Sequence, residues 1–408
     1  MRTSRLWITE SPSREFNENY PNFTYDLDKI SPFLEKAYAS INLLLESELT
    51  LENNLADSIN LKIYENEIVG SSLIEGEQLN GSQVRSSLRT RLLIDPSNNE
   101  FIGSTPKEDS LVELFLDSVK RTPASFSKEV LLAWHEQLFS TASPLKKRQV
   151  SLGKYRTDEI DIVSGSIGFE KIHYAGVPSQ RVEELMDDLI VYIQSSKDDP
   201  ITKSAIAHIA FEIIHPLDDG NGRIGRLISN MILPKDFSSK CSISQYINLH
   251  RKDYYDALAN ASAYSNKCDL TDWIVWFSNA VTKAVELRIS LSQKELNRDA
   301  FFKNISEQKN YSLSLTQKKV LEKIINMDNS TLIGNFDVKK YRSLAGGKIS
   351  IKQASEEMMD LIDLDCFDKG ENCWKISFPE ETSNIFLKIF KTTEDNELKV
   401  RDISGNLN

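Results

Sequence analysis

The stretch from His215 to Arg226 reads His-Pro-Leu-Asp-Asp-Gly-Asn-Gly-Arg-Ile-Gly-Arg. Apolar residues at helical spacing lead into it from Ala205 to Ile214, and Pro216 cannot continue that helix because proline lacks a backbone N–H. A second apolar stripe runs from Ile224 to Ile232 and is ended by Pro234. We therefore predict a loop held between two strongly apolar helices, which is a rigid mount for a preorganised site.

The residue types in this loop suit a bound phosphate. Gly220-Asn221-Gly222 opens the second helix, and backbone N–H groups at a helix N-terminus bind anions. Arg223 and Arg226 lie three residues apart, so they share a helix face and can reach the same anion. Asp219 could hold magnesium beside that phosphate, and His215 is a candidate general base. The residues alone therefore predict a phosphate, a metal and a proton-transfer group in one place.

The composition of the whole chain narrows the class of protein. Its 408 residues allow two or three domains, and its formal net charge of −11 argues against broad, sequence-independent binding of nucleic acid. The four cysteines form no C-x-x-C pair, so we expect a reducing compartment and neither a zinc site nor a disulfide framework. The N-terminus has no apolar signal region, and no apolar run is long enough to span a bilayer. We expect a soluble, cytoplasmic protein with no membrane partner.

Helical periodicity dominates the first 300 residues. Ser31-Pro32 is typical of an N-cap followed by the first helical position. A second helix is expected from about Thr50, with a stop near Gly70. By residue type alone, residues 71–77 are then an ordinary helix corner with Gly76 as the C-cap. Residues 159–163 and 170–174 instead alternate polar and apolar side chains around a glycine-containing loop, which predicts one β-hairpin.

The C-terminal part has a different organisation. Residues 299–310 are polar, and we interpret them as a linker or an exposed helix end. Residues 311–377 then show three helical patterns followed by a hairpin, which is the order of a winged helix-turn-helix. The expected domains are an N-terminal helical region (1–106), a central core (107–298), a winged-helix domain (311–377) and a C-terminal tail (378–408).

The central motif resembles the Fic family signature H-P-F-x-D/E-G-N-G-R-x-x-R. Leu217 stands where the family usually has phenylalanine, which keeps the position apolar. The Asn-Gly-Arg form resembles members that transfer AMP from ATP more than the Doc-type kinases, in which a lysine follows the asparagine. The matching positions are His215, Pro216, Asp219, Gly220, Asn221, Gly222, Arg223 and Arg226.

A second stretch also resembles the family. Residues 71–76 fit its inhibitory motif S/T-x-x-x-E-G/N, so the resemblance gives Ser71, Glu75 and Gly76 an inhibitory role that residue types alone did not. In the class with an N-terminal inhibitory helix, Glu75 would pair with Arg226 and occupy the ligand of the ATP γ-phosphate. A buried charge pair is costly to break on one side, so relief would need a population shift, for example by oligomerisation or modification.

The resemblance implies an all-α fold: a mainly helical Fic core with a small β-hairpin flap, plus a C-terminal winged helix. The implied activity is an autoinhibited protein adenylyltransferase that moves AMP from ATP to a Ser, Thr or Tyr hydroxyl of a protein, itself or another. Magnesium is the implied cofactor, and a homodimer is expected. In some members the equivalent of Glu75 serves the removal of AMP, and that alternative stays open here.

The resemblance also assigns roles to individual residues. His215 would be the general base, and Asp219 would hold magnesium. The hairpin, with Ile160, Ile162 and Val163, would align the target by backbone pairing. Tyr254 or Tyr255 would contact adenine, although core packing is an equal alternative for both. The residues expected around the nucleotide are Gly220, Asn221, Gly222, Arg223, Ile224, Gly225, Arg226, Tyr254 and Tyr255.

Other interpretations compete with these. Asp218, His208, His135, His173 and His250 are expected to be structural, because no constellation of reactive groups accompanies them. Lys352 and Gln353 could contact DNA, but Glu356 and Glu357 would repel phosphates, so we favour a protein-interaction role for the winged helix.

Two alternative functions remain open. One is a DNA-binding regulator that uses the Fic core as a nucleotide sensor. The other is the transfer of a different phosphate-linked group, because a helix N-terminus accepts many anions.

Overall fold

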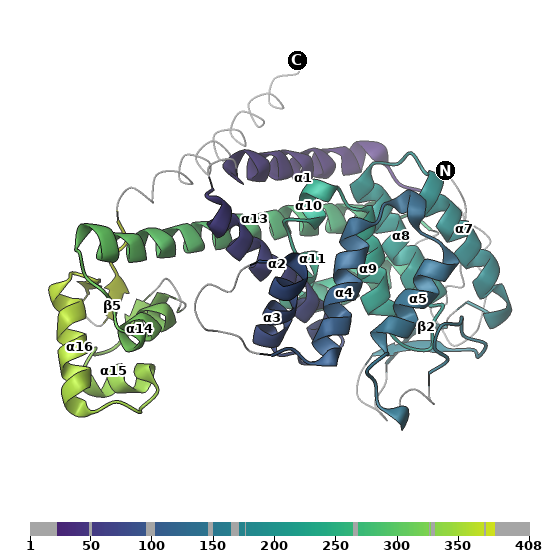
Figure 1. Cartoon of the computed structure of the whole chain (residues 1–408). Helices are drawn as coiled ribbons and strands as arrows, with labels where there is room; N and C mark the ends of the chain where they lie inside the picture. The colour runs from purple at the N-terminus through teal and green to yellow at the C-terminus, as the bar shows by residue number, and fades with distance from the viewer. Residues whose placement is uncertain are drawn as a thin grey trace, which may run out of the picture. The chain divides into compact units, whose positions relative to one another are not determined.

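The computed structural model describes residues 23–48, 51–94, 103–145, 150–164, 171–175, 177–263, 268–325, 327, 331–370 and 373–379. It describes the backbone only for 53–54, 161–164 and 171–175. The chain forms two compact units, residues 1–289 and 290–408, which are treated separately below (Figure 1). Among the described residues, no helix has the length and apolar character needed to cross a membrane.

The first unit is helical with one small hairpin. Its elements in chain order are α1 (Leu27–Glu48), α2 (Asn53–Ile74), α3 (Gly81–Leu92), α4 (Pro106–Lys120), η1 (Pro123–Ser125), α5 (Lys128–Leu138), β1 (Asp161–Ser164), β2 (Lys171–Ala175), η2 (Ser179–Arg181), α7 (Val182–Ser195), α8 (Pro200–Ile214), α9 (Asn221–Ile232), α10 (Lys235–Ser238), α11 (Ile243–Leu249), α12 (Arg251–Ser262) and α13 (Thr271–Lys303). The last of these helices continues into the second unit.

Helix α8 lies at the centre of the first unit. Most of its residues are buried, because its sequence is apolar on every face rather than along one stripe. The α9 helix crosses it closely at Gly225, where an added Cβ would lie 3.3 Å from the Phe211 ring. The indole N–H of Trp273 donates to the Ala205 carbonyl (2.7 Å) and ties α13 to the same helix. The two predicted helices around the motif loop are therefore confirmed, and both lie in the core.

Helix α2 is fastened to α9 and α11 through a buried glutamate. Glu67 accepts hydrogen bonds from Asn230 Nδ2 (2.8 Å), Ser242 Oγ (2.7 Å), and Ser244 N and Oγ (2.9 and 2.5 Å). Gly70 lies against the backbone of Ser244, where a Cβ would come within 3.1 Å. The prediction that the helix stops near Gly70 was wrong, because this glycine permits a close helix contact and α2 continues to Ile74.

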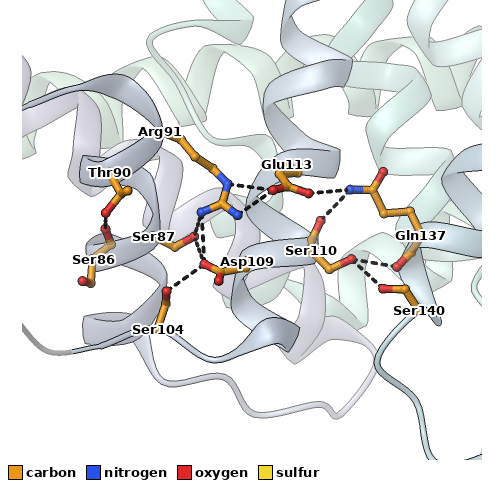
Figure 2. Close-up of polar contacts among 10 residues, drawn as sticks. All are labelled: Ser86, Ser87, Thr90, Arg91, Ser104, Asp109, Ser110, Glu113, Gln137 and Ser140. Carbon is orange, nitrogen blue, oxygen red and sulfur yellow. Dashed lines mark hydrogen bonds and ion pairs between the residues drawn. The ribbon is translucent and has the colours of Figure 1, made fainter.

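A polar network fastens α3 to α4 and α5 (Figure 2). The Arg91 guanidinium bridges Asp109 (3.0 Å) and Glu113 (2.6 Å), two residues of α4. From the same helix, Ser110 Oγ donates to the Gln137 carbonyl of α5 (2.8 Å). The end of α3, the helix that follows α2, is therefore bonded to α4.

Two N-terminal expectations need correction. Helix α1 begins at Leu27, so Ser31-Pro32 is not its start, and Pro32 lies inside the helix. Pro32 is the sixth residue of the helix and removes the N–H that would donate to the Asp28 carbonyl, while Ser31 Oγ donates to the Leu27 carbonyl (2.7 Å). Helix α3 was not predicted, although Asn80 caps it by accepting from two backbone N–H groups.

The predicted hairpin is confirmed. Strands β1 and β2 pair antiparallel from Asp161↔Ala175 to Ser164↔Lys171, with a bulge between Ile162 and Val163. The loop at 165–170 lies outside the described residues. The hairpin leaves the helical body at 160 and returns to it at 177.

The second unit adds a small three-stranded antiparallel sheet in the order β3-β5-β4. The three predicted helices and the hairpin are present, whereas strand β3 was missed. After α13 the elements are η4 (Asn304–Gln308), α14 (Leu315–Ile325), β3 (Thr331–Ile333), α15 (Val338–Ala345), α16 (Ile351–Asp363), β4 (Phe367–Lys369) and β5 (Cys373–Ile376).

Residues 299–310 are a helix end, one of the two predicted alternatives, and not a linker, because α13 runs to Lys303 and η4 follows it. Phe301 and Ile305 are buried in the hydrophobic core of the second unit, so the expected boundary at 298 falls inside a continuous helix. The polar composition of this stretch suggested a linker because only one face of the helix is apolar. The predicted tail at 378–408 lies outside the described residues beyond 379.

Candidate active site

Left-handed residues stand at both ends of the motif loop. His215 caps α8 in a left-handed conformation (φ 48°), and its N–H donates to the Phe211 carbonyl (2.9 Å). Gly220 begins α9 with φ 89°, which glycine adopts without a Cβ penalty. Leu217 is fully buried, so the apolar character expected at this position is used for packing. The loop thus directs the N-terminus of α9 back toward His215.

The side chain of Asn221 closes the motif loop. Its side chain accepts from Leu217 N (3.0 Å) and donates to the Leu217 carbonyl (2.8 Å), and the residue is buried. The amide is therefore fully engaged in closing the loop. The backbone N–H of Asn221 could still contact an anion at the N-terminus of α9, and its predicted place at the nucleotide stays a prediction.

Arg226 meets the end of α2, as the family resemblance implied. Its Nε donates to Ser71 Oγ (2.9 Å), and its Nη2 donates to the Ser71 carbonyl (2.8 Å) and to Glu75 Oε1 (2.8 Å). The arginine side chain is 1% exposed, and Nη1 has no hydrogen-bond partner among the described residues. Burial lowers the pKa of Arg226, but Glu75, Tyr254 and Glu212 together hold that pKa above its ordinary value.

The contact between Arg226 and Glu75 depends on a glycine. A Cβ at Gly222 would lie 2.3 Å from Glu75 Oε1 and 3.1 Å from Arg226 Nη1. Glycine at this motif position therefore leaves room for the glutamate as well as for any phosphate. Gly225, also predicted at the nucleotide, instead faces Glu212 and Phe211 of α8, and Ile224 is buried in the core.

Glu77 directly follows the inhibitory stretch at 71–76, and no role is predicted for it from the sequence. Its Oε2 accepts from Arg223 Nη1 (2.9 Å), and its Oε1 lies 2.8 Å from Lys107 Nζ. Gly76 is left-handed (φ 77°), and the Glu77 N–H donates to the Ser72 carbonyl (2.9 Å), which completes a Schellman-type helix end. The sequence signal was the pair of glutamates on either side of a C-cap glycine.

Asp219 lies at the edge of a cavity of about 410 Å³. Its carboxylate is partly exposed and lies 3.8 Å from Arg223 Nη2. Among the described residues, no three His, Cys, Asp or Glu side chains gather to hold a metal. Magnesium commonly uses one or two carboxylates and completes its shell with substrate phosphates and water, so a lone Asp219 fits that ion. Beside Asp219, the cavity is lined by Glu75, Glu77, Lys107, Leu111, Leu138, Phe139, Thr141, Ala142 and Arg223.

His215 has the environment of a neutral base. Burial lowers its pKa to about 4; the Glu212 carbonyl and the Glu75 and Asp219 carboxylates oppose that shift, and the Arg156 guanidinium adds to it. Nδ1 lies 3.2 Å from the Glu212 carbonyl, so a proton on Nδ1 would leave Nε2 free to accept one. The Glu212 carboxyl itself, which sequence reasoning did not single out, has its pKa raised by burial to about 7.

The two tyrosines differ in exposure. Tyr254 is buried, and its hydroxyl is 2.8 Å from His208 Nε2, while Nδ1 of that histidine is 2.9 Å from Ser229 Oγ. Tyr254 is thus a core residue, which corrects its placement at the nucleotide, and His208 is structural as expected. Tyr255 is 42% exposed, and its hydroxyl is 3.5 Å from the Ile74 carbonyl at the end of α2. Of the two tyrosines, only Tyr255 has a ring exposed enough to contact a ligand.

The remaining predicted residues fall in three groups. Asp218 accepts from the Ser151 N–H (2.8 Å), His135 is buried beside Phe139, and His250 stacks on Tyr246, so all three are structural. Ile160 immediately precedes β1 and is partly exposed. The side chains of Ile162, Val163 and His173 lie outside the described part of the structure, and their roles stay predictions.

Two family models match the chain. The one described as Fic/DOC family matches residues 125–233, which contain the whole motif loop and its flanking helices. The other describes a domain of unknown function and matches residues 16–94. Residues 125–233 of the chain therefore form a Fic/DOC family domain.

Known proteins of this family resemble the chain at low identity. Protein adenylyltransferase fic-1 of Caenorhabditis briggsae is 28% identical over 167 residues, which cover 39% of this chain and 30% of that protein. Protein adenylyltransferase Fic of Aedes aegypti is 24% identical over 231 residues, which cover 55% and 41%. The chain is thus a distant relative of protein adenylyltransferases and spans less than half of either protein.

Two solved structures align with the chain at low similarity. A Fic family protein from Desulfovibrio desulfuricans G20 matches with a TM-score of 0.49 at 19% identity, over 85% of this chain and 96% of that one. Residues 134–508 of Fic-1 from C. elegans match with a TM-score of 0.46 at 19% identity, over 64% and 72%.

Proposed function

We propose that the chain is an autoinhibited protein adenylyltransferase. The observation that carries this proposal is the ion pair between Arg226 and Glu75 (2.8 Å) at the N-terminus of α9. An arginine on the first turns of such a helix is suited to a polyphosphate, and a carboxylate in hydrogen-bond contact with it competes for the same donors. The residues around that pair supply the other parts that AMP transfer requires.

The reaction would proceed by attack of a Ser, Thr or Tyr hydroxyl on the α-phosphorus of ATP. The new bond joins the hydroxyl oxygen to that phosphorus, the bond to pyrophosphate breaks, and His215 Nε2 takes the hydroxyl proton. The backbone N–H groups that open α9 and the Arg223 side chain would stabilise charge on the phosphoryl oxygens. Asp219 would hold magnesium, which supplies charge neutralisation when bound.

Inhibition would follow from the two glutamates at the end of α2. Glu75 pairs with Arg226, and Glu77 pairs with Arg223, so a phosphate would compete with a carboxylate at each motif arginine while the α2 end is in place. Because the Arg226 side chain is 1% exposed, water cannot compensate it once its partner leaves, which favours the paired state until ATP replaces the carboxylate. Removal of AMP by water that Glu75 orients is compatible with the same arrangement.

Transfer of label tests the proposal. Wild type, Glu75→Gly and Glu75→Gly with His215→Ala are incubated with magnesium and ATP labelled at the α-phosphate. We expect Glu75→Gly to label itself or an added lysate on the order of tenfold or more above wild type, and the double variant to lose the label. Equal labelling in wild type and Glu75→Gly would refute inhibition, and label that survives His215→Ala would refute the base.

The specificity for ATP is tested with the same variants. ATP, other nucleotides and other phosphate-linked donors are compared at equal concentration in the Glu75→Gly form. Mass spectrometry should find AMP on the modified residue. A different phosphate-linked adduct would support the alternative that another group is transferred.

For the second unit we propose a winged-helix domain that binds protein. The helices α14 to α16 and the three-stranded sheet have the required order, and the exposed face of α16 carries Ile351, Lys352 and Met359. Glu357 is not on that face, because it is buried and accepts from Tyr341 Oη (2.9 Å) and Ser314 Oγ (2.9 Å). Of the two glutamates, only Glu356 is therefore exposed, and DNA binding is kept as the alternative.

A further inference from the structure

Arg156 is a buried arginine whose side chain donates to four backbone carbonyls. It is 2% exposed. Nε donates to His215 O (2.7 Å), Nη1 to Asp158 O (2.8 Å), and Nη2 to Val177 O (2.6 Å) and Ile214 O (3.2 Å). Its backbone N–H donates to Pro216 O (2.8 Å).

These carbonyls belong to three segments that must be placed relative to one another. Asp158 lies just before β1, and Val177 lies just after β2, so both ends of the hairpin meet at one guanidinium. Ile214 and His215 end α8, where carbonyls without a helical partner meet the negative end of the helix dipole. A cation at this point satisfies both the hydrogen-bonding and the electrostatic demand of the helix end.

The backbone of His215 needs such support. A residue with a Cβ is disfavoured at φ 48°, and such a conformation persists only where surrounding contacts over-determine it. The bond from Arg156 to the His215 carbonyl, together with the bond from the His215 N–H to Phe211, holds the peptide groups on either side of that residue. Lysine could not replace this pattern, because it has no planar fork of donors.

We infer that Arg156 is a positioning residue that sets His215 relative to the β-hairpin. The inference rests on the proposed function, in which the hairpin aligns the target segment and His215 takes its proton. One guanidinium then fixes the distance between the strand that would hold the target and the imidazole that would act on it. The four carbonyls that the Arg156 side chain holds belong to the two ends of the hairpin and to the end of α8, and none belongs to α9, so its replacement should spare the nucleotide.

The charge of Arg156 gives a second, independent readout. The groups that act on the His215 imidazole are the Glu212 carbonyl, Arg156, Glu75 and Asp219, and among them Arg156 alone lowers the pKa of His215 in addition to burial. A base works in its neutral form, so the acid limb of the rate lies at its pKa. Removal of the guanidinium raises that pKa and moves the acid limb to higher pH, whereas lysine preserves the charge and the limb.

The experiment uses the full chain in the Glu75→Gly background, with Arg156→Lys, Arg156→Met and the control Arg288→Lys. Arg288 is an equally buried arginine that pairs with Glu48, away from the motif. We expect both Arg156 variants to lose about tenfold to a hundredfold in the rate of self-modification at saturating ATP. The affinity for ATP should stay within about twofold, and only Arg156→Met should shift the acid limb.

Stability separates positioning from simple loss of fold. Arg156→Lys and Arg288→Lys should both lower the midpoint of thermal unfolding, but only the first should reduce the rate. A rate in Arg156→Lys equal to that of Arg288→Lys at matched folded fraction would overturn the inference.

If no variant transfers AMP, the proposed function is refuted but the positioning role of Arg156 is not. A second measurement tests that role without AMP transfer. NMR of ¹⁵N-labelled histidine, assigned with His215→Gln, reports the tautomer and titration of the imidazole in each variant. We expect a change at His215 in Arg156→Lys and none in Arg288→Lys. Unchanged His215 signals in both Arg156 variants would overturn the positioning role.

Discussion

At the scale of single residues, the site pairs one buried arginine with a partly exposed glutamate. Arg226 is almost completely buried, and its partner Glu75 comes from a helix 151 residues earlier in the chain. Asn221 shows a different case, because its side chain forms hydrogen bonds to the backbone of the loop. The same motif therefore contains residues that bind and residues that only hold the backbone.

Glu77 allows a test at this scale. Because it neutralises Arg223 and Lys107, Glu77→Gln should free two cations beside the cavity and tighten ATP binding by about three- to tenfold. Calorimetry with ATP measures the change, with Glu286→Gln as the control, since that glutamate forms an exposed pair with Lys283 elsewhere. Weaker binding in Glu77→Gln would mean that the carboxylate contacts the nucleotide or its metal instead.

Glu212 predicts a pH dependence of stability. Its pKa is about 7 in the folded chain against an ordinary 4.5, so between those pH values the folded state binds more protons than the unfolded one. The free energy of unfolding then falls as the pH rises through this window, by up to about 3 kcal/mol from this group alone. Urea unfolding at pH 5 and pH 8 should show that Glu212→Gln removes this fall, relative to wild type. An unchanged difference between the two pH values would contradict it.

At the scale of elements, α2 is both the carrier of the two glutamates and a fastened helix. Glu67, two turns before Glu75, ties it to α9 and α11, and the Gly70 contact leaves no gap between α2 and the backbone of α11. Relief of inhibition by a rigid shift of α2 would break all of these bonds. Rearrangement of its last turn, from Ser71 onward, would break far fewer.

The fastening of α2 can be measured. Glu67→Ala leaves the donors of Asn230, Ser242 and Ser244 without their acceptor and should lower the free energy of unfolding by roughly 2–4 kcal/mol. If α2 holds the glutamates in place, the same variant should raise AMP transfer above wild type while it remains folded. Chemical denaturation and label transfer are compared at a temperature below the transition. Lower stability without any gain in transfer would show that the last turn is held independently of Glu67.

At the scale of the whole molecule, the two units share α13 but have separate cores. The polar stretch at 299–310 belongs to the second core, which explains why composition placed the boundary too late. The chain's net charge of −11 opposes DNA binding over the whole molecule, whatever the local charge of α16. A full-length chain should therefore give no gel shift on genomic fragments at physiological salt. A shift that resists rising salt would favour the regulator alternative.

The sequence by itself determined the helix–loop–helix that carries His215, because its apolar pattern, proline stop and glycines act over short distances. It also determined the hairpin and the family. The tertiary structure alone decided that Asn221 and Tyr254 are internal, that Gly70 is a contact, and that Glu77 and Arg156 reach the motif. Each of these depends on residues far apart in the chain, where local periodicity carries no information about which buried polar group meets which partner.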